Sequence, residues 1–282
     1  MASVNSPIRK ILKPILFRII SKSAYKLIQS IAKIRDIKLR LVEEKEMEIL
    51  KYFIKEGDDV IDLGANYAYY LERLSKIVGK DGRVFGFEPV PFTYEVCEII
   101  VRKLKLQNIK LFQYAANNEN VKLEFRLPKV DFGAISAGQS HRADRNNKIQ
   151  GKESYYSFPK EEIIICEGKK VDDLLFEELR TLSFIKIDIE GAELFALQGM
   201  QKTIKKFNPV ILIEIQPFFL EGYNIKESEI ISYITDELDY EMYFYDQEIR
   251  KLRIVNRDLR ESNYILLPNE IKDQFRKIIY EK

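Results

Sequence analysis

Beyond residue 58 the chain alternates between short apolar runs and longer stretches with helical periodicity. The apolar runs end at glycine or at charged residues, as buried parallel strands commonly do. Strands that alternate with helices predict an α/β fold built on a doubly wound, mostly parallel sheet. The predicted strands are 59–63, 83–87, 109–114, 184–188 and 210–215, and the predicted helices are 67–78, 92–106 and 191–206.

Two regions depart from this alternation. Residues 117–182 form a long irregular insertion, with short strand candidates at 121–127 and 163–166. Because so long a loop in a compact domain usually has a function, we expect a functional loop or lid there. Nearer the C-terminus, 240–245 and 264–267 have the composition of strands and no long helix between them. They predict an antiparallel hairpin added at the edge of the sheet.

The first 45 residues follow a different pattern. Between residues 8 and 34 helical spacing is evident, and Pro14 makes the helix start or kink near that position. One face of this helix carries six aliphatic residues, Ile8, Ile11, Leu12, Ile15, Leu16 and Ile19. We expect a basic helical extension over residues 1–45 before a main domain of residues 46–282. The helix either packs on the body of the protein or lies on an anionic membrane.

Charge is unevenly distributed, although 46 Lys and Arg nearly balance 44 Asp and Glu. Residues 1–40 contain ten Lys or Arg and one acid, so a basic arm precedes an acidic body, and such an arm suggests an acidic partner. No apolar run approaches the roughly 20 residues of a membrane span, and Lys13 and Arg18 interrupt any signal-peptide core. We expect a cytoplasmic protein, with residues 8–34 suited to peripheral contact at the inner face of the membrane.

Cysteine and histidine are too scarce for several kinds of site. The two cysteines, Cys97 and Cys166, cannot form a disulfide framework and are expected in the core. His141 is the single histidine, so a zinc site built from His and Cys is nearly excluded. His141 lies in the insertion, where an isolated histidine is usually exposed to solvent. A role in substrate binding or base catalysis is the alternative.

The first candidate site is the sequence Asp62-Leu-Gly-Ala-Asn66, which follows the first predicted strand. Open parallel sheets bind ligands beyond the carboxyl ends of their strands, and Gly64 allows the backbone to approach a ligand closely. Glu88 ends the second strand, where an acid can accept hydrogen bonds from both hydroxyls of a ribose. The two features together indicate a cofactor that contains a nucleoside. The motif lacks the lysine of a P-loop, so a phosphate cradle is disfavoured.

The second candidate site is the segment 184–193, at the end of the fourth strand. Lys186 and Asp188 share one face of this strand, and a buried lysine requires a partner. Asp188, Glu190 and Glu193 are candidate partners. Glu214 of the fifth strand either pairs with Lys186 or faces the substrate cleft. One interpretation is a structural salt bridge with a helix-capping acid. The other is a site at the ligand-binding edge of the sheet.

Five stretches in order resemble the FkbM family of methyltransferases. They are Asp-Leu-Gly-Ala-Asn (62–66), Val-Phe-Gly-Phe-Glu-Pro-Val-Pro (84–91), Val-Asp-Asp-Leu (171–174), Ile-Lys-Ile-Asp-Ile-Glu-Gly-Ala-Glu (185–193) and Asn-Pro-Val-Ile-Leu-Ile-Glu-Ile (208–215). The resemblance implies the class I methyltransferase fold, which is Rossmann-like, and S-adenosylmethionine as the cofactor. The family usually has glycine where this chain has Ala68.

The resemblance also implies roles for individual residues. The cofactor-binding set would be Asp62, Gly64, Ala65, Asn66, Glu88, Pro89, Ala115, Ala116 and Asp188, with Glu88 on the ribose and the two alanines near the adenine. The catalytic set would be Asp188, Glu190 and Lys186, with Asp188 as the first choice and Glu190 the second for accepting or orienting the substrate's proton. A divalent metal held by Asp188 and Glu190 is conceivable, but no metal site is predicted.

The expected reaction is in-line transfer of the methyl group of S-adenosylmethionine to a hydroxyl of a sugar, a glycan or another small metabolite. A nucleic-acid substrate is disfavoured, because the body is acidic and the motifs for methylating base nitrogens or cytosine carbon are missing. Methylation of another nitrogen, or a protein that binds the cofactor or a partner without turnover, is the alternative. The sequence does not predict the oligomeric state.

Overall fold

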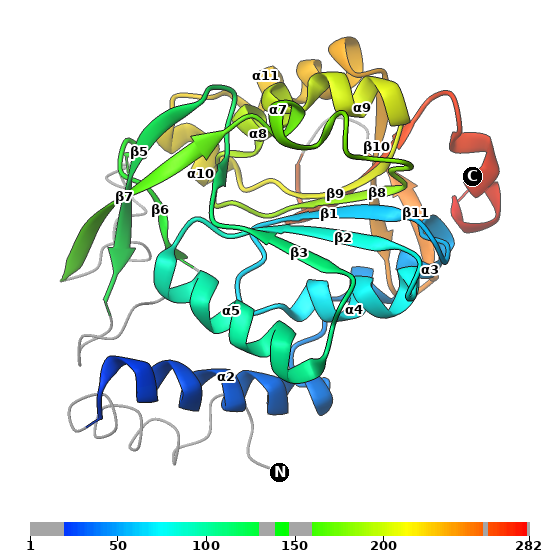
Figure 1. The fold of residues 1–282 in the computed structure, drawn as a ribbon. Coiled ribbons are helices and arrows are strands. Elements are labelled where there is room, and N and C mark those ends of the chain that lie inside the picture. Colours follow the sequence, from blue (N-terminus) through cyan, green and yellow to red (C-terminus); the bar gives the residue numbers. More distant parts are fainter. Residues whose placement is uncertain (1–19, 130–138, 147–159, 256–258, 281–282) are drawn as a thin grey trace.

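The computed structural model describes residues 20–129, 139–146, 160–255 and 259–280, and all structural statements below concern these residues. Its centre is an eight-stranded sheet with the order β11-β10-β12-β9-β8-β1-β2-β3 (Figure 1). Five neighbouring strands are parallel, namely β9 (Val210–Glu214), β8 (Phe184–Ile187), β1 (Asp59–Leu63), β2 (Arg83–Phe87) and β3 (Ile109–Phe112). The predicted α/β fold with a mostly parallel sheet is therefore confirmed.

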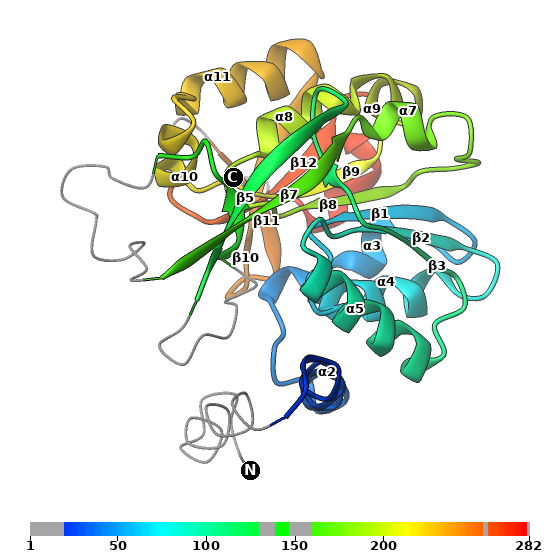
Figure 2. The same ribbon diagram turned by 60° about the vertical axis from the view of Figure 1, so that its left-hand side comes forward.

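Helices cover both faces of this sheet (Figures 1 and 2). One face packs against α3 (Leu50–Phe53), α4 (Tyr69–Val78) and α5 (Pro91–Leu104). The other packs against α7 (Val171–Leu175), α8 (Glu193–Gly199), α9 (Gln201–Phe207), α10 (Pro217–Gly222) and α11 (Glu227–Ser232), which a π-helical turn (Tyr233–Glu237) continues. Two separate apolar cores result, one on each face.

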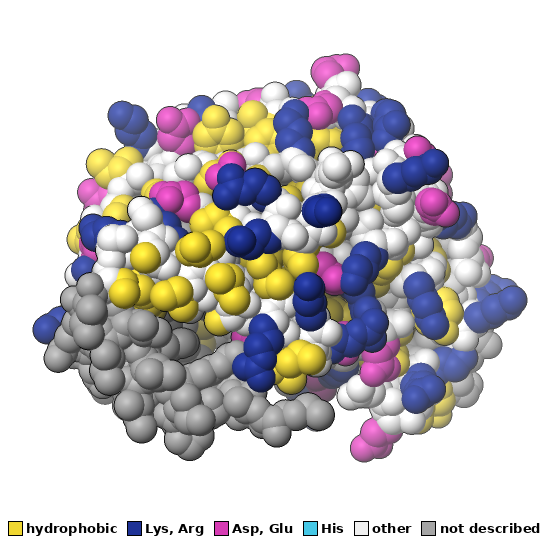
Figure 3. All heavy atoms as spheres, turned by 60° about the horizontal axis from the view of Figure 1, so that its bottom comes forward, with side chains coloured by type: hydrophobic (Ala, Val, Ile, Leu, Met, Phe, Trp, Pro, Cys, Tyr) yellow, Lys and Arg dark blue, Asp and Glu magenta, His cyan; other side chains and the backbone are white. Residues whose placement is uncertain are grey.

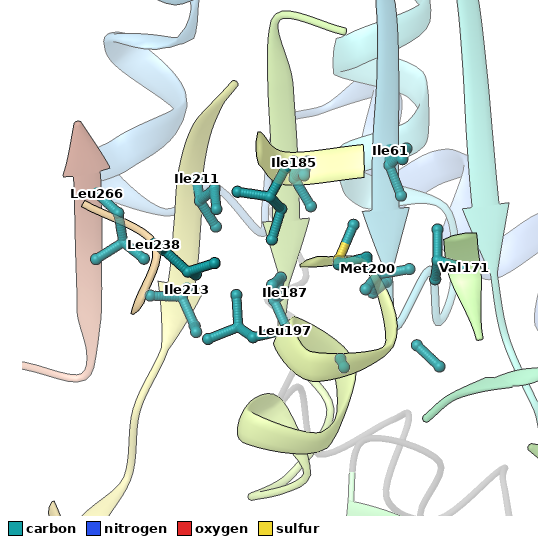
Figure 4. Close-up of a cluster of buried hydrophobic side chains, with 14 of the residues drawn as sticks. Ile61, Val171, Ile185, Ile187, Leu197, Met200, Ile211, Ile213, Leu238 and Leu266 are labelled. Atoms are coloured by element: carbon teal, nitrogen blue, oxygen red, sulfur yellow. The ribbon is translucent and has the colours of Figure 1, made fainter. Parts of the chain in front are cut away.

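Alternation along each strand builds both cores. Ile185 and Ile187 of β8 meet Leu197 and Met200 on one face, as Figure 4 shows, while Phe184 joins the core on the opposite face. Because side chains in a strand point alternately to the two faces, a strand covered on both sides must be apolar throughout. This explains why the central strands appear in the sequence as continuous apolar runs.

The insertion is more regular than the sequence predicted. It contributes to a second sheet of order β4-β7-β5-β6, formed by β4 (Ala115–Ala116), β7 (Glu161–Lys169), β5 (Val121–Pro128) and β6 (His141–Arg142). The expected strands at 121–127 and 163–166 are present, and the second is longer than expected. In Figure 2 this sheet stands beside the edge of the main sheet, above the start of α5.

The single helix predicted over 191–206 is wrong, because α8 and α9 are separate helices that meet at Met200. Gly199 approaches the backbone of Asn117 so closely that a Cβ there would lie 1.9 Å from its carbonyl oxygen. The helix is therefore interrupted where it contacts the backbone that follows β4. The predicted helix 67–78 begins two residues late, at Tyr69, because Ala68 has a left-handed conformation with φ +63°.

The C-terminal strands form the antiparallel part of the sheet. The expected pair corresponds to β10 (Tyr240–Asp246) and β12 (Asn263–Pro268), which are antiparallel to each other. β12 lies between β10 and β9 rather than at the edge. A strand that the sequence did not predict, β11 (Lys251–Ile254), takes the edge position. A short 3₁₀ helix, Lys272–Ile278, follows.

The described part of the N-terminal extension contains α2 (Lys22–Lys38), which lies along α5 (Figures 1 and 2). Ser21 caps α2, because its Oγ accepts a hydrogen bond from the backbone N–H of Ala24. A short 3₁₀ helix, Lys45–Glu48, leads on to α3. The six aliphatic residues of the predicted helical face, Ile8 to Ile19, lie outside the described residues. Within the described residues, no helix is long and apolar enough to cross a membrane.

Candidate active site

A cavity of about 240 Å³ lies at the carboxyl edge of the parallel strands. The main sheet and the second sheet both contribute to its walls, so residues distant in sequence face one another across it. Its lining includes Leu63, Gly64, Asn66, Phe87, Glu88, Pro89, Val90, Tyr114, Ala115, Ala116, Phe125, Ser140, Arg142, Asp188, Ile189, Glu190, Ala192 and Glu214. Most predicted site residues are therefore brought together. Asp62, Ala65 and Lys186 are not part of this lining.

The loop after β1 is held tightly against the neighbouring strands. The backbone N–H groups of Gly64 and Ala65 both donate to the carbonyl oxygen of Phe87, at 3.0 and 2.8 Å. Gly64 has φ +87°, and a Cβ at this position would lie 1.9 Å from the carbonyl oxygen of Asp188. Glycine is thus required at position 64 both by its backbone conformation and by the close approach of β8.

Glu88 connects this loop to the one after β2. Its Oε2 accepts a hydrogen bond from the backbone N–H of Asn66, and its Oε1 accepts one from the N–H of Val90, each at 3.0 Å. The carboxylate has room for further hydrogen bonds, since each oxygen has two lone pairs. Burial raises the pKa of Glu88 to about 7, against the effect of these two hydrogen bonds.

Asn66 supplies a second polar group to the same wall. Its side-chain Oδ1 is buried and has no hydrogen-bond partner among the described residues. A buried acceptor without a donor is unfavourable, and such groups often mark a place for a ligand or an ordered water. Asn66 and Glu88 therefore form a polar end of the cavity that can still accept hydrogen bonds.

Lys186 and Asp188 are partners, as the sequence suggested. Lys186 Nζ donates to Asp188 Oδ2 at 2.9 Å and lies 4.6 Å from the ring centroid of Tyr70. Opposite Lys186 in the parallel register is Asp62, whose carboxylate is buried. Burial alone would raise the pKa of Asp188, but the ammonium group stabilises the ionised form, and the pKa is lowered. Burial does raise the pKa of Asp62 to about 6, and Lys186 opposes that rise.

Asp188 is the member of this group that faces the cavity, since its side chain is 35% exposed whereas that of Lys186 is 5% exposed. Lys186 therefore supports Asp188 from beneath the cavity wall. Lys186, which was predicted in the catalytic set, contacts Asp188 but does not line the cavity. Of the two alternatives for Glu214, the structure supports a place facing the cavity, where Glu214 shares a hydrogen bond with Asp188.

Three further acids surround Asp188, and all three have raised pKa values. Burial, followed by the charge of Asp188, raises the pKa of Glu214 to about 9 and that of Glu190 to about 8. Burial raises the pKa of Glu193 to about 7, although its Oε1 accepts hydrogen bonds from the backbone N–H groups of Ile189 and Gly191. At neutral pH Glu214 and Glu190 mostly carry protons, so they can donate as well as accept hydrogen bonds.

Another part of the cavity wall is mainly apolar. Ala115 and Ala116 of β4 lie there with Tyr114, beside the stacked rings of Phe87 and Phe112, whose centroids are 4.8 Å apart. This is where the sequence placed the adenine.

The insertion adds three cavity residues that the sequence analysis missed, namely Phe125 of β5, Ser140 just before β6, and Arg142 of β6. Arg142 Nη1 donates to Asn117 Oδ1 at 2.9 Å, and its guanidinium lies 4.5 Å from the ring centroid of Phe195. Nothing in the local sequence marks Ser140 or Arg142, because only the pairing of β6 with β5 brings them to the cavity. The sequence around Ser140 and Arg142 is a polar run, which by itself assigns them no role.

His141 itself is buried, so the expectation of an exposed histidine is wrong. Its Nδ1 hydrogen bonds with the carbonyl oxygen of Gln139 at 2.9 Å, and burial lowers its pKa to about 4. It is not part of the cavity lining. Cys97 and Cys166 are buried, as expected. Among the described residues, no group of three or more His, Cys, Asp or Glu side chains is arranged to hold a metal ion.

Several known methyltransferases are similar to this chain. The family model of the methyltransferase FkbM domain matches residues 62–242. A curated protein-L-isoaspartate O-methyltransferase from Methanococcus aeolicus is 36% identical over 58 residues, which are 21% of this chain and 27% of that protein. The crystal structure of an FkbM methyltransferase from Methylobacillus flagellatus is similar with a TM-score of 0.45 and 14% identity, covering 86% of this chain and 59% of that one.

An Aeropyrum pernix fibrillarin that was solved with bound S-adenosyl-L-methionine is similar with a TM-score of 0.42 and 14% identity, covering 78% of this chain and 72% of that one. The chain thus spans about a quarter of the curated relative and about three fifths of the Methylobacillus protein. The FkbM domain, by contrast, covers more than half of this chain and includes all five of the quoted motifs. The chain belongs to the FkbM family of S-adenosylmethionine-dependent methyltransferases.

Proposed function

We propose that the protein methylates a hydroxyl oxygen of a sugar, a glycan or another small hydroxylated metabolite, with S-adenosylmethionine as the methyl donor. One observation carries the proposal. A single cavity has the acceptor groups of Glu88 and Asn66 at one wall and the partly exposed carboxylate of Asp188 at another. This arrangement can hold a nucleoside and a reacting hydroxyl side by side.

The residues present fit the cofactor. Glu88 has lone pairs left for the two ribose hydroxyls, and Asn66 Oδ1 can accept a hydrogen bond from the amino-acid end. The alanines of β4 leave room for a flat base. Bound S-adenosylmethionine would supply an electrophilic methyl group on its sulfonium.

Asp188 is suited to orient the attacking hydroxyl and to receive its proton. Its carboxylate is held in place by Lys186 on one side and by Glu214 on the other. Because the pKa of Asp188 is lowered, the carboxylate stays ionised at neutral pH and acts first as a hydrogen-bond acceptor. The proton that leaves the hydroxyl would pass to this pair of carboxyl groups, which titrate together. Lys186 acts as a positioning residue.

The polar wall around Asp188 supports a substrate rich in hydroxyl groups. Glu190 and Glu214 are mostly protonated at neutral pH, and Ser140 and Arg142 add donors from the insertion. A polyhydroxylated ligand offers both donors and acceptors and can satisfy such a mixed set. A strongly anionic ligand would be repelled by the negative charge of Asp188.

The test is a transfer assay with radiolabelled S-adenosylmethionine against free monosaccharides, nucleotide-activated sugars, oligosaccharides, small hydroxy acids, amines and RNA. We expect label on a sugar or hydroxy-acid fraction, with the methyl group on oxygen by NMR. Label on amines or RNA would overturn the choice of substrate. Tight binding of the cofactor with no transfer to any acceptor would favour a protein that binds without turnover.

A further inference from the structure

Several aliphatic side chains of α2 lie on its outer side, although Ile34 and Ile37 near its C-terminal end pack on the body. Leu27, Ile28 and Ile31 are 42, 37 and 52% exposed, and with the half-buried Ala24 they follow the spacing of one helical face. We call Ala24, Leu27, Ile28 and Ile31 the aliphatic stripe. A surface helix of a globular protein normally buries such a stripe and exposes its polar face. In α2 this stripe is instead exposed to solvent.

Specific contacts fix this orientation. On the inner side of α2, Lys26 forms an ion pair with Glu95 of α5, and Tyr25 packs on Phe92 with ring centroids 6.1 Å apart. Lys33 lies 4.4 Å from the ring centroid of Tyr67, in the loop just before α4. Charged and aromatic residues thus attach α2 to the body. The stripe must then point away from α5.

Basic residues flank the stripe. Lys22, Arg35 and Lys38 of α2 are exposed, and a hollow of about 160 Å³ opens at the C-terminal end of the helix. Four basic and two acidic residues line this hollow, namely Lys38, Arg40, Arg73, Lys76, Glu43 and Glu72. Figure 3 views the molecule from the side of α2, and yellow hydrophobic side chains lie there among many dark blue Lys and Arg side chains.

We propose that this face of α2 docks on the surface of an anionic lipid bilayer. An interfacial helix inserts an aliphatic stripe below the headgroups while flanking Lys and Arg side chains contact anionic phosphates. Figures 1 and 2 show α2, a helix of 17 residues, at the outside of the molecule. Two copies of this face would bring like charges together, so the charge pattern favours lipid over a second copy of the chain.

The test is co-sedimentation of the full chain with vesicles of phosphatidylcholine alone and of equal parts phosphatidylcholine and phosphatidylglycerol. We expect binding to the anionic vesicles that weakens at high salt. Leu27→Ser/Ile31→Ser should weaken the partition coefficient by about tenfold or more, because it removes two inserted side chains. Arg35→Gln/Lys38→Gln should weaken it by about thirtyfold, at roughly fivefold for each basic residue.

Matched controls separate this face from the rest of the surface. Ile163→Ser/Ile165→Ser removes two aliphatic side chains of β7 that are at least as exposed, and Lys202→Gln/Lys205→Gln removes two exposed lysines from α9. Both should bind the vesicles as wild type does. Absent binding to anionic vesicles, or unchanged binding by both α2 variants with normal melting, would overturn the proposal. A dimer in light scattering that Leu27→Ser/Ile31→Ser converts to a monomer would assign the stripe to self-association instead.

Discussion

At the scale of single residues, Glu88 joins two loops as well as facing the cavity. The two backbone N–H groups that it binds belong to the loops after β1 and β2. A carboxylate in this position orders both loops before any ligand arrives. Binding and local stability are therefore coupled through one side chain.

We expect Glu88→Ala to weaken the binding of S-adenosylmethionine by roughly ten- to a thousandfold, since two charge-assisted hydrogen bonds are lost. The melting temperature of the cofactor-free protein should also fall, because the N–H groups of Asn66 and Val90 lose their acceptor. Calorimetry and thermal melting measure the two effects. The control is Asp59→Asn, which breaks a buried ion pair with Arg83 at the opposite end of β1 and should lower stability without changing affinity. Unchanged affinity in Glu88→Ala would contradict the placement of the ribose.

Asp188→Asn keeps the size of the side chain and removes its charge. We expect turnover to fall by about a hundred- to ten-thousandfold, while the affinity for S-adenosylmethionine stays within about tenfold. If the residue served only as the partner of buried Lys186, the main effect would be a loss of stability of roughly 3–5 kcal/mol. Melting curves beside a turnover assay distinguish these outcomes. Normal melting with normal turnover would exclude both roles.

At the scale of elements, the break between α8 and α9 links a helix to the cavity. Gly199 leaves space for the backbone of Asn117, which directly follows the cavity residue Ala116. A side chain at position 199 would push α8 away from β4. The part of the cavity wall that β4 forms depends on this contact.

Gly199→Ala should therefore destabilise the protein by about 2–3 kcal/mol and weaken cofactor binding, since the added Cβ meets backbone that cannot rotate away. The matched control is Gly57→Ala. Gly57 has φ +91°, but a Cβ there would have no heavy atom within 4 Å, so only backbone strain is expected and affinity should be retained. Denaturant unfolding and calorimetry give both quantities. Equal affinities in the two variants would show that β4 does not depend on Gly199.

The sequence best predicted those elements whose conformation depends on residues nearby in the chain. The central strands were predicted because burial on both faces makes them apolar throughout, and Glu88 and Asp188 because they end such strands. The break at Met200 was missed because its cause, Asn117, lies far away in the chain. Arg142 was missed for the same reason, since only pairing with β5 places it at the cavity. The sequence alone could not predict that Asp62 lies opposite Lys186, because this depends on the register between β1 and β8.

At the scale of the whole molecule, the site concentrates acids in a buried place. Five of them have raised pKa values, namely Asp62 at about 6, Glu88 and Glu193 at about 7, Glu190 at about 8 and Glu214 at about 9. Buried cations are fewer than these acids in the described part of the chain, with Lys186 beneath the strands and Arg145 beside Glu190. Much of this acidic group therefore remains protonated in the folded protein at neutral pH.

This arrangement predicts how stability depends on pH. An unfolded carboxyl group loses its proton near pH 4, but these groups keep theirs to higher pH in the fold. Between those values the folded state binds more protons, so the free energy of unfolding falls as pH rises. We expect the cofactor-free protein to lose at least about 2 kcal/mol between about pH 5 and pH 9. Glu214→Gln should flatten the curve, whereas Asp59→Asn should not, because the pKa of Asp59 is lowered. A curve that rises over this range would contradict the assignment.

The position of β12 also determines when the sheet can be completed. β12 is the last strand of the main sheet along the chain, yet it lies between β9 and β10 and hydrogen bonds with both. Until residues 263–268 have been synthesised, β9 and β10 each have an unpaired backbone edge that another chain could bind. The main sheet therefore stays in two parts until β12 has been synthesised. Misassembly between nascent chains is expected first at β9 and β10.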